Sequence, residues 1–271
     1  MMTVPVALTI AGSDSSGGAG IQADLKTFAA LGVYGASVIT ALTAQNTQGV
    51  AAIHNVPAHF VTAQIDAVFG DLDVGALKIG MVAQVAVIDA ITAGLSRWKP
   101  AHVVLDPVMV ATSGARLLES DAIEALRSKL VPRAQLLTPN LPEAAVLLDE
   151  PVAEGEPDIV RQGQRLLEFG CAAVLIKGGH MHGPESIDYL VTRQGTMTFA
   201  APRAVTRNTH GTGCSLSSAI VAGLAKGDGM ETAVRGAKAY VTAAIAAADR
   251  LNIGRGHGPI HHFHQFEHFR F

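Results

Sequence analysis

The sequence is poor in cysteine and in charged residues, and it contains no long apolar run. Two cysteines among 271 residues cannot form the disulfide framework of a small secreted domain. The first 25 residues contain no Lys or Arg, so the basic start of a secretory signal is missing. No apolar run approaches the roughly 18 residues that a membrane span needs. We therefore expect a cytoplasmic protein with no membrane partner.

The balance of charge makes a nucleic-acid partner unexpected. Charged residues make up 16% of the chain and the formal net charge is -3, which gives no electrostatic attraction to polyanions. Hydrophobic residues make up 49%, which excludes general disorder and allows a large core. Because repeats, linkers and composition breaks are missing, we expect a single domain spanning residues 1–271.

Short β-branched runs alternate with segments of helical periodicity. This alternation predicts an α/β fold with a mostly parallel sheet covered by helices. The expected strands are residues 4–11, 37–43, 74–79, 102–105, 135–138 and 172–176, followed by a hairpin over 187–200. The expected helices contain Ile21, Leu25 and Phe28; Phe60, Ile65, Val68 and Leu72; Ile123, Leu126 and Leu130; and two final helices that begin near Gly213 and Met230.

The segment Gly211-Thr212-Gly213-Cys214 comes directly before an apolar stretch with helical character. Glycines let the backbone approach a ligand closely, and the N–H groups at a helix N-terminus attract phosphate. A cysteine at this position is expected to have a lowered pKa. A Gly-rich helix cap with a packed cysteine explains the four residues equally well.

A second glycine cluster, Asp14 to Gly20, lies between the first strand and the first helix. Ligands of α/β proteins bind outside the carboxyl ends of the strands, where this loop belongs. A plain turn is an equal explanation, because both G-x-G-x-x-G and the Walker A pattern are missing from the chain.

Polar residues also follow three later strands. Asp106 and Glu143 have the oxygen ligands that Mg²⁺ prefers, although an Asp-Pro turn and a helix N-terminal acid explain them too. Lys177 can neutralise a phosphate, or it can simply cap the sheet edge in water. Cys171, at the other end of the last of these strands, is expected to be a buried small hydrophobe.

The histidine-rich tail contains the pattern H-x-x-E-H from His264 to His268, which is found in some zinc proteases. It leaves no room for a third ligand downstream, so a packed or frayed tail is the better interpretation.

Taken in order, the motifs resemble one family. They are residues 8–24, Ala44-Gln45-Asn46-Thr47, Lys78-Ile79-Gly80-Met81, residues 104–109, Thr138-Pro139-Asn140, Lys177-Gly178-Gly179-His180, residues 208–214 and the closing segment 258–264. The chain resembles the bacterial hydroxymethylpyrimidine and hydroxymethylpyrimidine-phosphate kinases of thiamine biosynthesis nearly end to end.

The resemblance implies a ribokinase-like three-layer α/β/α fold and ATP-dependent phosphorylation of 4-amino-5-hydroxymethyl-2-methylpyrimidine, then of its monophosphate. It implies ATP and Mg²⁺ as cofactors and a homodimer. The implied roles are Gln45 on the pyrimidine edge; Gly12 and Met81 against the ring; Ala19 and Asp24 as pocket lining; Asp106 and Glu143 for Mg²⁺; Asn140 and Lys177 for the nucleotide phosphates; and Gly211, Thr212, Gly213 and Cys214 at the transferring phosphoryl group.

One position differs from the wider superfamily, and another differs from nearer relatives. Many sugar kinases of the wider superfamily have an aspartate as general base where this chain has Cys214, so a thiolate would take that role here. Relatives commonly carry lysine in place of Thr112, in a flap that shields the nucleotide phosphates.

Two other functions remain open. A pyridoxal kinase has the same scaffold, but its flap cysteine has no counterpart among Val110, Ala111 and Thr112. A non-catalytic vitamin-binding protein would have lost its Mg²⁺ or phosphate residues, whereas Asp106, Glu143 and Lys177 are all present.

Overall fold

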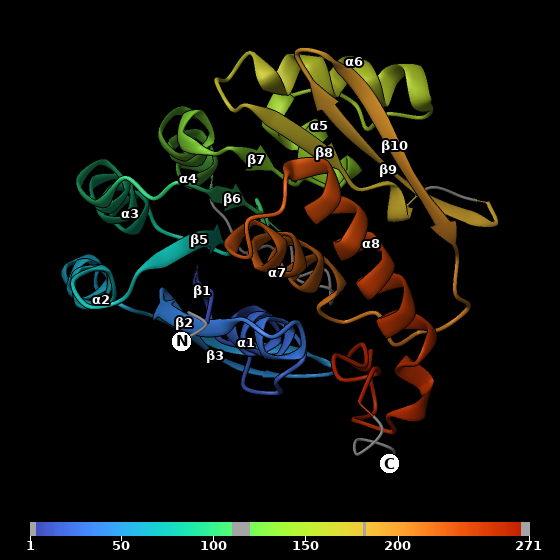
Figure 1. Ribbon diagram of the computed structural model, residues 1–271, viewed down its shortest axis with the longest axis horizontal. Helices are drawn as coiled ribbons and strands as arrows, with labels where there is room; N and C mark the ends of the chain where they lie inside the picture. Colours follow the sequence, from blue (N-terminus) through green and yellow to red (C-terminus); the bar gives the residue numbers. More distant parts are fainter. Residues whose placement is uncertain (1–3, 110–119, 181–182, 267–271) are drawn as a thin grey trace.

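In the computed structural model, which describes residues 4–109, 120–180 and 183–266, one twisted eight-stranded sheet runs through the molecule. The strand order is β10-β9-β8-β7-β6-β5-β1-β2, and all pairs from β2 to β8 are parallel. Strands β9 and β10 form an antiparallel hairpin at one edge (Figure 1). The strands are β1 Val6–Ala11, β2 Tyr34–Ile39, β5 Val74–Ile79, β6 Val103–Leu105, β7 Leu136–Leu137, β8 Ala173–Ile176, β9 Glu185–Thr192 and β10 Gly195–Pro202.

Helices cover both faces of this sheet and give three layers. One core lies between the sheet and α2 to α6, and it contains Leu8, Ile10, Ile65, Ile91 and Leu147. The other lies between the sheet and α1, α7 and α8, with Ala7, Phe28 and Ile220 among its members. The helices are α1 Gly20–Ala30, α2 Ala58–Phe69, α3 Val85–Trp98, α4 Ser120–Ala125, α5 Leu141–Leu148, α6 Glu156–Leu167, α7 Thr212–Ala225 and α8 Met230–Ala246.

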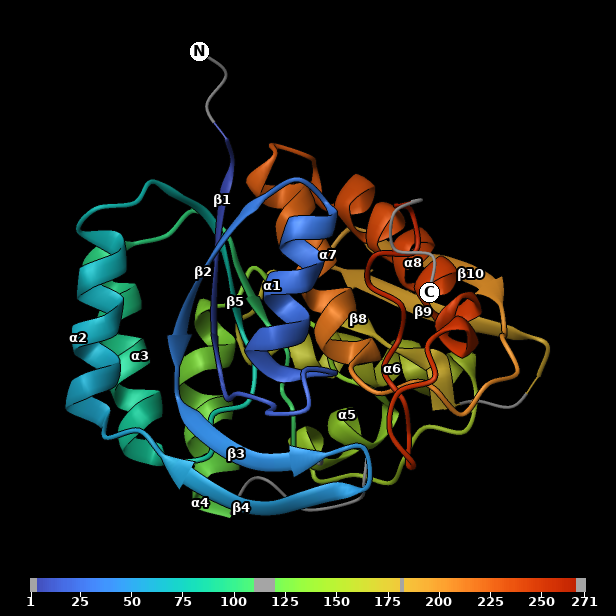
Figure 2. The same ribbon diagram turned by 90° about the horizontal axis from the view of Figure 1, so that it is seen from below.

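A separate two-stranded sheet, β3 Ala41–Asn46 and β4 Gly49–Asn55, lies across the end of the main sheet (Figure 2). The chain enters it at Thr40, directly after β2. The expected continuous strand over 37–43 is therefore wrong. The alternating burial along β3 places Thr43 inward and Leu42 outward, because successive strand side chains point to opposite faces.

Most of the other expected elements are confirmed, including the hairpin and the starts of the last two helices. Phe60 does not face the sheet as expected, since it is 55% exposed while its neighbour Val61 is buried. The sequence prediction contained no counterpart of α3 or α6.

The chain between 257 and 266 packs against the domain. His261 and His262 are buried, and the Ser215 hydroxyl lies 3.0 Å from His262 Nε2. The packed tail is thus confirmed for this segment, whereas Glu267 and His268 lie outside the described residues. Cys171 is buried as expected.

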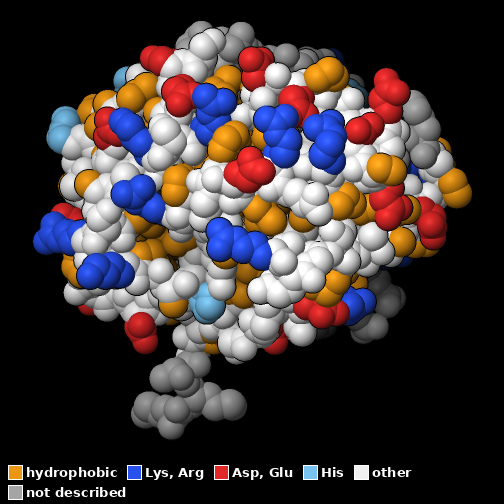
Figure 3. Space-filling model, turned by 90° about the horizontal axis from the view of Figure 1, so that it is seen from above, with side chains coloured by type: hydrophobic (Ala, Val, Ile, Leu, Met, Phe, Trp, Pro, Cys, Tyr) orange, Lys and Arg blue, Asp and Glu red, His pale blue; other side chains and the backbone are white. Residues whose placement is uncertain are grey.

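On the outer surface, Lys and Arg side chains lie among Asp, Glu and hydrophobic ones over the face that Figure 3 shows. Within the described ranges, 4–109, 120–180 and 183–266, none of the helices is long and apolar enough to span a bilayer.

Candidate active site

The carboxyl ends of five parallel strands open into one cavity of about 730 Å³. Parallel strands end at the same edge of a sheet, so the residues that follow them are brought together however far apart they lie in the chain. Gly12, Met81, Asp106, Asn140 and Lys177, which follow β1, β5, β6, β7 and β8, all line this cavity.

The N-terminus of α7 forms one wall of the cavity. Gly211 is the N-cap of this helix and has φ +82°, a conformation that favours glycine. A Cβ on Gly211 would also collide with the carbonyl oxygen of Gly18. The first turn, Thr212 to Cys214, lines the cavity and places the positive end of the helix dipole beside it, and the Thr212 N–H itself donates to the Thr209 carbonyl over 3.2 Å.

Lys177 lies between two carboxylates. Its Nζ is 2.8 Å from Asp106 Oδ1 and 3.8 Å from Glu143 Oε2. Burial alone would lower the pKa of Lys177, but the two carboxylates outweigh it and raise that pKa above its usual range. Burial alone would raise the pKa of Asp106, but Lys177 and Lys78 hold it below its usual range. The charged form of each group is thus stabilised by the other.

Glu143 and Asn140 begin helix α5 as a capping box. The Glu143 N–H donates to Asn140 Oδ1, and the Asn140 N–H donates to Glu143 Oε2, each over 2.8 Å. Burial raises the pKa of Glu143 because the attraction of Lys177 only partly offsets the lost hydration and the nearby charge of Asp106. Both residues line the cavity and also fix the start of this helix.

Two carboxylates beside a cavity suit Mg²⁺, which takes one or two carboxylates and completes its shell with phosphates and water. No group of three or more His, Cys, Asp or Glu side chains able to hold a metal occurs among the described residues. The two carboxylates of Asp106 and Glu143 fit an ion whose remaining ligands are nucleotide phosphates and water.

Cys214 lies in the first turn of α7 and faces the cavity. Its expected low pKa is wrong. Burial raises the pKa of Cys214, and the carboxylates of Asp24 and Asp106 add to this, whereas Lys78 and the Gly20 N–H act in the opposite direction. The loss of hydration and the two carboxylates thus outweigh Lys78 and the Gly20 N–H at this position.

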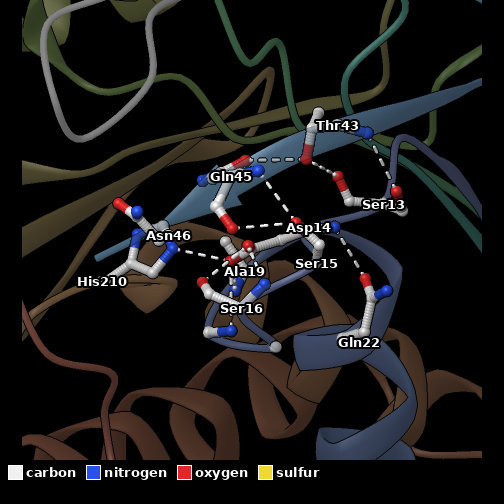
Figure 4. Close-up of polar contacts among 12 residues, drawn as sticks. Ser13, Asp14, Ser15, Ser16, Ala19, Gln22, Thr43, Gln45, Asn46 and His210 are labelled. Atoms are coloured by element: carbon white, nitrogen blue, oxygen red, sulfur yellow. Dashed lines mark hydrogen bonds and ion pairs between the residues drawn. The ribbon is translucent and has the colours of Figure 1, made fainter. Parts of the chain in front are cut away.

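Gln45, Gly12, Ala19 and Met81 line the other end of the same cavity. The Thr43 hydroxyl donates to Gln45 Oε1 over 3.1 Å, and the Ser15 hydroxyl bonds both the N–H and the carbonyl of Gln45 over 2.8 Å (Figure 4). A Cβ on Gly12 would collide with Met81 Cε, so these two residues are in direct contact.

Asp24 does not line the cavity as the resemblance implied. It is fully buried beneath it, where its Oδ1 lies 2.5 Å from Lys78 Nζ. The hydroxyls of Thr9 and Ser218 also donate to this carboxylate, over 2.6 and 2.7 Å. Asp24 therefore neutralises a buried lysine instead of contacting a ligand.

Several cavity residues had no individual role in the sequence analysis, among them Asp14, Lys78 and His210. A lysine inside the apolar strand Val74–Ile79 was a readable signal, because a buried charge needs a partner. The pairing of Asp14 with His210 had no such signal, since 196 positions separate the two residues.

Comparisons with known proteins show the family to which the chain belongs. A family model described as phosphomethylpyrimidine kinase matches residues 14–261. A hydroxymethylpyrimidine/phosphomethylpyrimidine kinase of Rhizobium meliloti is 58% identical over 96% of this chain and 98% of its own length.

Two solved structures are similar over most of the chain. An ADP complex of Bacillus subtilis pyridoxal kinase has a TM-score of 0.89 at 33% identity and covers 96% of this chain and 98% of its own. A phosphomethylpyrimidine kinase of Clostridium difficile has a TM-score of 0.80 at 44% identity, over 90% and 100% of the two chains. The ribokinase-like α/β/α fold is thereby confirmed, and the chain belongs to the phosphomethylpyrimidine kinase family.

Proposed function

We propose that this kinase transfers a phosphoryl group from ATP to the hydroxymethyl group of 4-amino-5-hydroxymethyl-2-methylpyrimidine, and then to the monophosphate, in thiamine biosynthesis. One observation carries the proposal. The amide of Gln45, the glycines at the start of α7 and the ammonium group of Lys177 all line a single cavity of about 730 Å³. The 58% identical relative has the corresponding name.

The pocket end suits an aminopyrimidine. An amide both donates and accepts hydrogen bonds, so Gln45 can pair with a ring nitrogen and its amino group. Gly12, Met81 and Ala19 offer the apolar contacts for the ring. The hydroxymethyl group would then point toward Cys214.

The cradle end suits the transferring phosphoryl group. Phosphoryl transfer depends on positioning and on charge stabilisation more than on covalent help from the protein. Backbone N–H groups of Gly211 to Cys214 would bind the phosphoryl oxygens, and Lys177 and Asn140 would bind the nucleotide phosphates. Pro202, Val241 and Ile245 continue the cavity as an apolar surface for the base of ATP.

Mg²⁺ would be held by Asp106 and Glu143, and when bound it would neutralise phosphate charge. Lys177 already contacts Asp106, so its ammonium group can stay beside that carboxylate or turn toward a phosphate. Cys214 is the proposed proton acceptor for the substrate hydroxyl. We also propose that residues 1–271 act as a single domain and that the chain forms a homodimer, as the resemblance implies.

Steady-state rates of ADP formation with the pyrimidine alcohol and with its monophosphate test the function. We expect turnover of both. We also expect Gln45→Leu to raise the KM for the alcohol at least about tenfold, because the ring nitrogen and amino group of the pyrimidine would lose their hydrogen-bond partner. Gln48→Leu, an exposed residue on the same hairpin, is the matched control and should leave both KM values unchanged. A wild-type protein that does not consume ATP with either substrate would instead support a non-catalytic vitamin-binding protein.

Pyridoxal is the second candidate substrate, because the Bacillus subtilis pyridoxal kinase has a TM-score of 0.89 to this chain. The flap residues Val110, Ala111 and Thr112 lie outside the described residues. The ratio of kcat/KM for the pyrimidine alcohol to that for pyridoxal decides between the two, and we expect it to exceed one.

A further inference from the structure

The two glycine loops of the site touch each other directly. The loop of residues 14–20 carries Ala19 of the ring pocket, and the loop of residues 209–214 carries the phosphate cradle. A Cβ on Gly18 would collide with the His210 ring, and a Cβ on Gly211 would collide with the Gly18 carbonyl. The backbones therefore meet with no space for a side chain between them.

The Asp14 carboxylate organises the first loop. Its Oδ1 accepts from the N–H and the hydroxyl of Ser16 over 2.9 and 2.7 Å, and its Oδ2 accepts from the N–H groups of Gly18 and Ala19 over 3.1 and 2.8 Å. These bonds fold the loop around a carboxylate that is only 1% exposed.

His210 is the residue of the second loop that donates a hydrogen bond to Asp14. Its Nε2 lies 2.7 Å from Asp14 Oδ2. Figure 4 marks this contact with a dashed line. His210 immediately precedes Gly211, the N-cap of helix α7, so its contact with Asp14 joins the first loop to the start of that helix. The backbone of His210 is held from the opposite side, because its N–H donates to the Gly258 carbonyl over 3.1 Å.

The same chain of contacts continues to the proposed pyrimidine reader. Ser15, next to Asp14, holds both backbone polar groups of Gln45. A continuous series of hydrogen bonds and peptide bonds thus joins Gln45, Ser15, Asp14, His210 and Gly211. In the proposed function, one end of this series would hold the acceptor substrate and the other end would hold the phosphoryl group.

We propose that His210 is a positioning residue, which through its hydrogen bond to Asp14 fixes the distance between the bound acceptor and the phosphate cradle. This inference rests on the proposed kinase function. Two substrates held by two different loops react only when the loops are correctly spaced, and a misplacement of about 1 Å can cost roughly 100-fold in rate.

Two amide substitutions of different length test the proposal. His210→Gln can place its Nε2 donor near the original position, whereas His210→Asn carries the same amide on a shorter side chain that cannot reach Asp14. We expect His210→Asn to lower kcat roughly 10- to 100-fold while each KM changes less than about threefold. His210→Gln should recover kcat to within about fivefold of the wild type.

Matched controls come from His102, whose Nδ1 lies 2.7 Å from Gln135 Oε1 at the opposite end of the sheet. His102→Asn and His102→Gln should leave kcat unchanged. Melting temperatures, together with calorimetric binding of ADP and of the pyrimidine, show whether each variant is folded and still binds its ligands.

Equal losses of kcat in His210→Gln and His210→Asn, or a normal kcat in His210→Asn, would overturn the proposal. So would a loss that appears only in KM. The proposed function fails separately, since it requires wild-type turnover of the pyrimidine, which is measured before any variant.

Discussion

At the scale of single residues, the environment of Cys214 decides how it can act. A cysteine in the first turn of a helix is expected to be acidic, but here burial and two neighbouring carboxylates raise its pKa. Its thiol is therefore mostly protonated at neutral pH. A base of this kind acts through a small thiolate fraction that grows with pH.

We predict that kcat of the wild type rises with pH from about 6 to 9, by up to tenfold per unit, as this fraction grows. Cys214→Ala should lower kcat by about 100-fold or more at pH 8 and should flatten this rise. Initial rates of both phosphorylations over that range provide the measurement. Cys171→Ala, which removes the buried thiol far from the cavity, is the control. Near-normal turnover of Cys214→Ala in both steps would show that the thiol is not the base.

At the scale of elements, the start of α7 depends on one backbone position. Gly211 combines a left-handed conformation with direct contact against the Gly18 carbonyl. The left-handed conformation and the close approach of the Gly18 carbonyl thus both require glycine at position 211. The methyl group of an alanine there would disturb both.

We predict that Gly211→Ala lowers the free energy of unfolding by about 2 to 4 kcal/mol, because left-handed strain alone costs about 1 to 2 kcal/mol and the collision adds to it. Its kcat should fall about 100-fold, since the cradle moves relative to the acceptor. Urea denaturation and steady-state rates provide the two measurements.

Gly227→Ala is the matched control, because Gly227 also has a positive φ, +92°, but a Cβ there would contact nothing within 4 Å. This variant should lose only about 1 to 2 kcal/mol and keep its kcat. If both variants kept normal kcat, the position of the cradle would not depend on the contact between Gly211 and Gly18.

The sequence predicted the strands that lead into the site where the local pattern was strong. The strands before Gly12, Asp106 and Lys177 are buried apolar runs, and each ends in a polar or glycine residue that can be recognised without the structure. The break at Thr40 could not be predicted, because the residues on both sides are equally suited to a strand. Which strands share an edge, and therefore which polar residues meet, depends on long-range packing.

The same limit applied to the site. The resemblance implied that Asp24 lines the pocket, but its distance from the cavity depends on how α1 packs against β1, β2 and α7. In the folded protein Asp24 instead forms a buried ion pair with Lys78. The pKa of Cys214 was wrongly predicted for a related reason, since sequence shows the helix start but not the depth of burial.

At the scale of the whole molecule, the packed segment 257–266 makes stability depend on pH. Burial lowers the pKa of His262 to about 3, with Lys26 and the neighbouring histidines adding to the effect. The unfolded chain takes up a proton below about pH 6.5, whereas the folded protein does not until far lower. The stability that neutral His262 contributes is thus complete above pH 6.5 and is lost as the pH falls.

We predict that His262→Gln, compared with the wild type, removes a slope of up to about 1.4 kcal/mol per pH unit below pH 6.5. As the pH falls from 6.5 to 5, the free energy of unfolding of the wild type should therefore decrease by about 2 kcal/mol more than that of the variant. Urea denaturation at several pH values gives this difference. The exposed His257→Gln should follow the wild type, and a parallel slope for His262→Gln would contradict the assignment.

The carbonyl of Gly258 that holds His210 also bears on how the protein is made. A ribosome that reaches Cys214 has completed the proposed pyrimidine pocket, Mg²⁺ residues and phosphate cradle, whereas Val241 and Ile245 of the proposed base surface are still missing. The nascent polypeptide also lacks Gly258, whose carbonyl holds the His210 backbone, and gains it only more than forty codons later. Translation that stalls in this interval would yield a chain that has the phosphate cradle but lacks the residue that holds His210 in place.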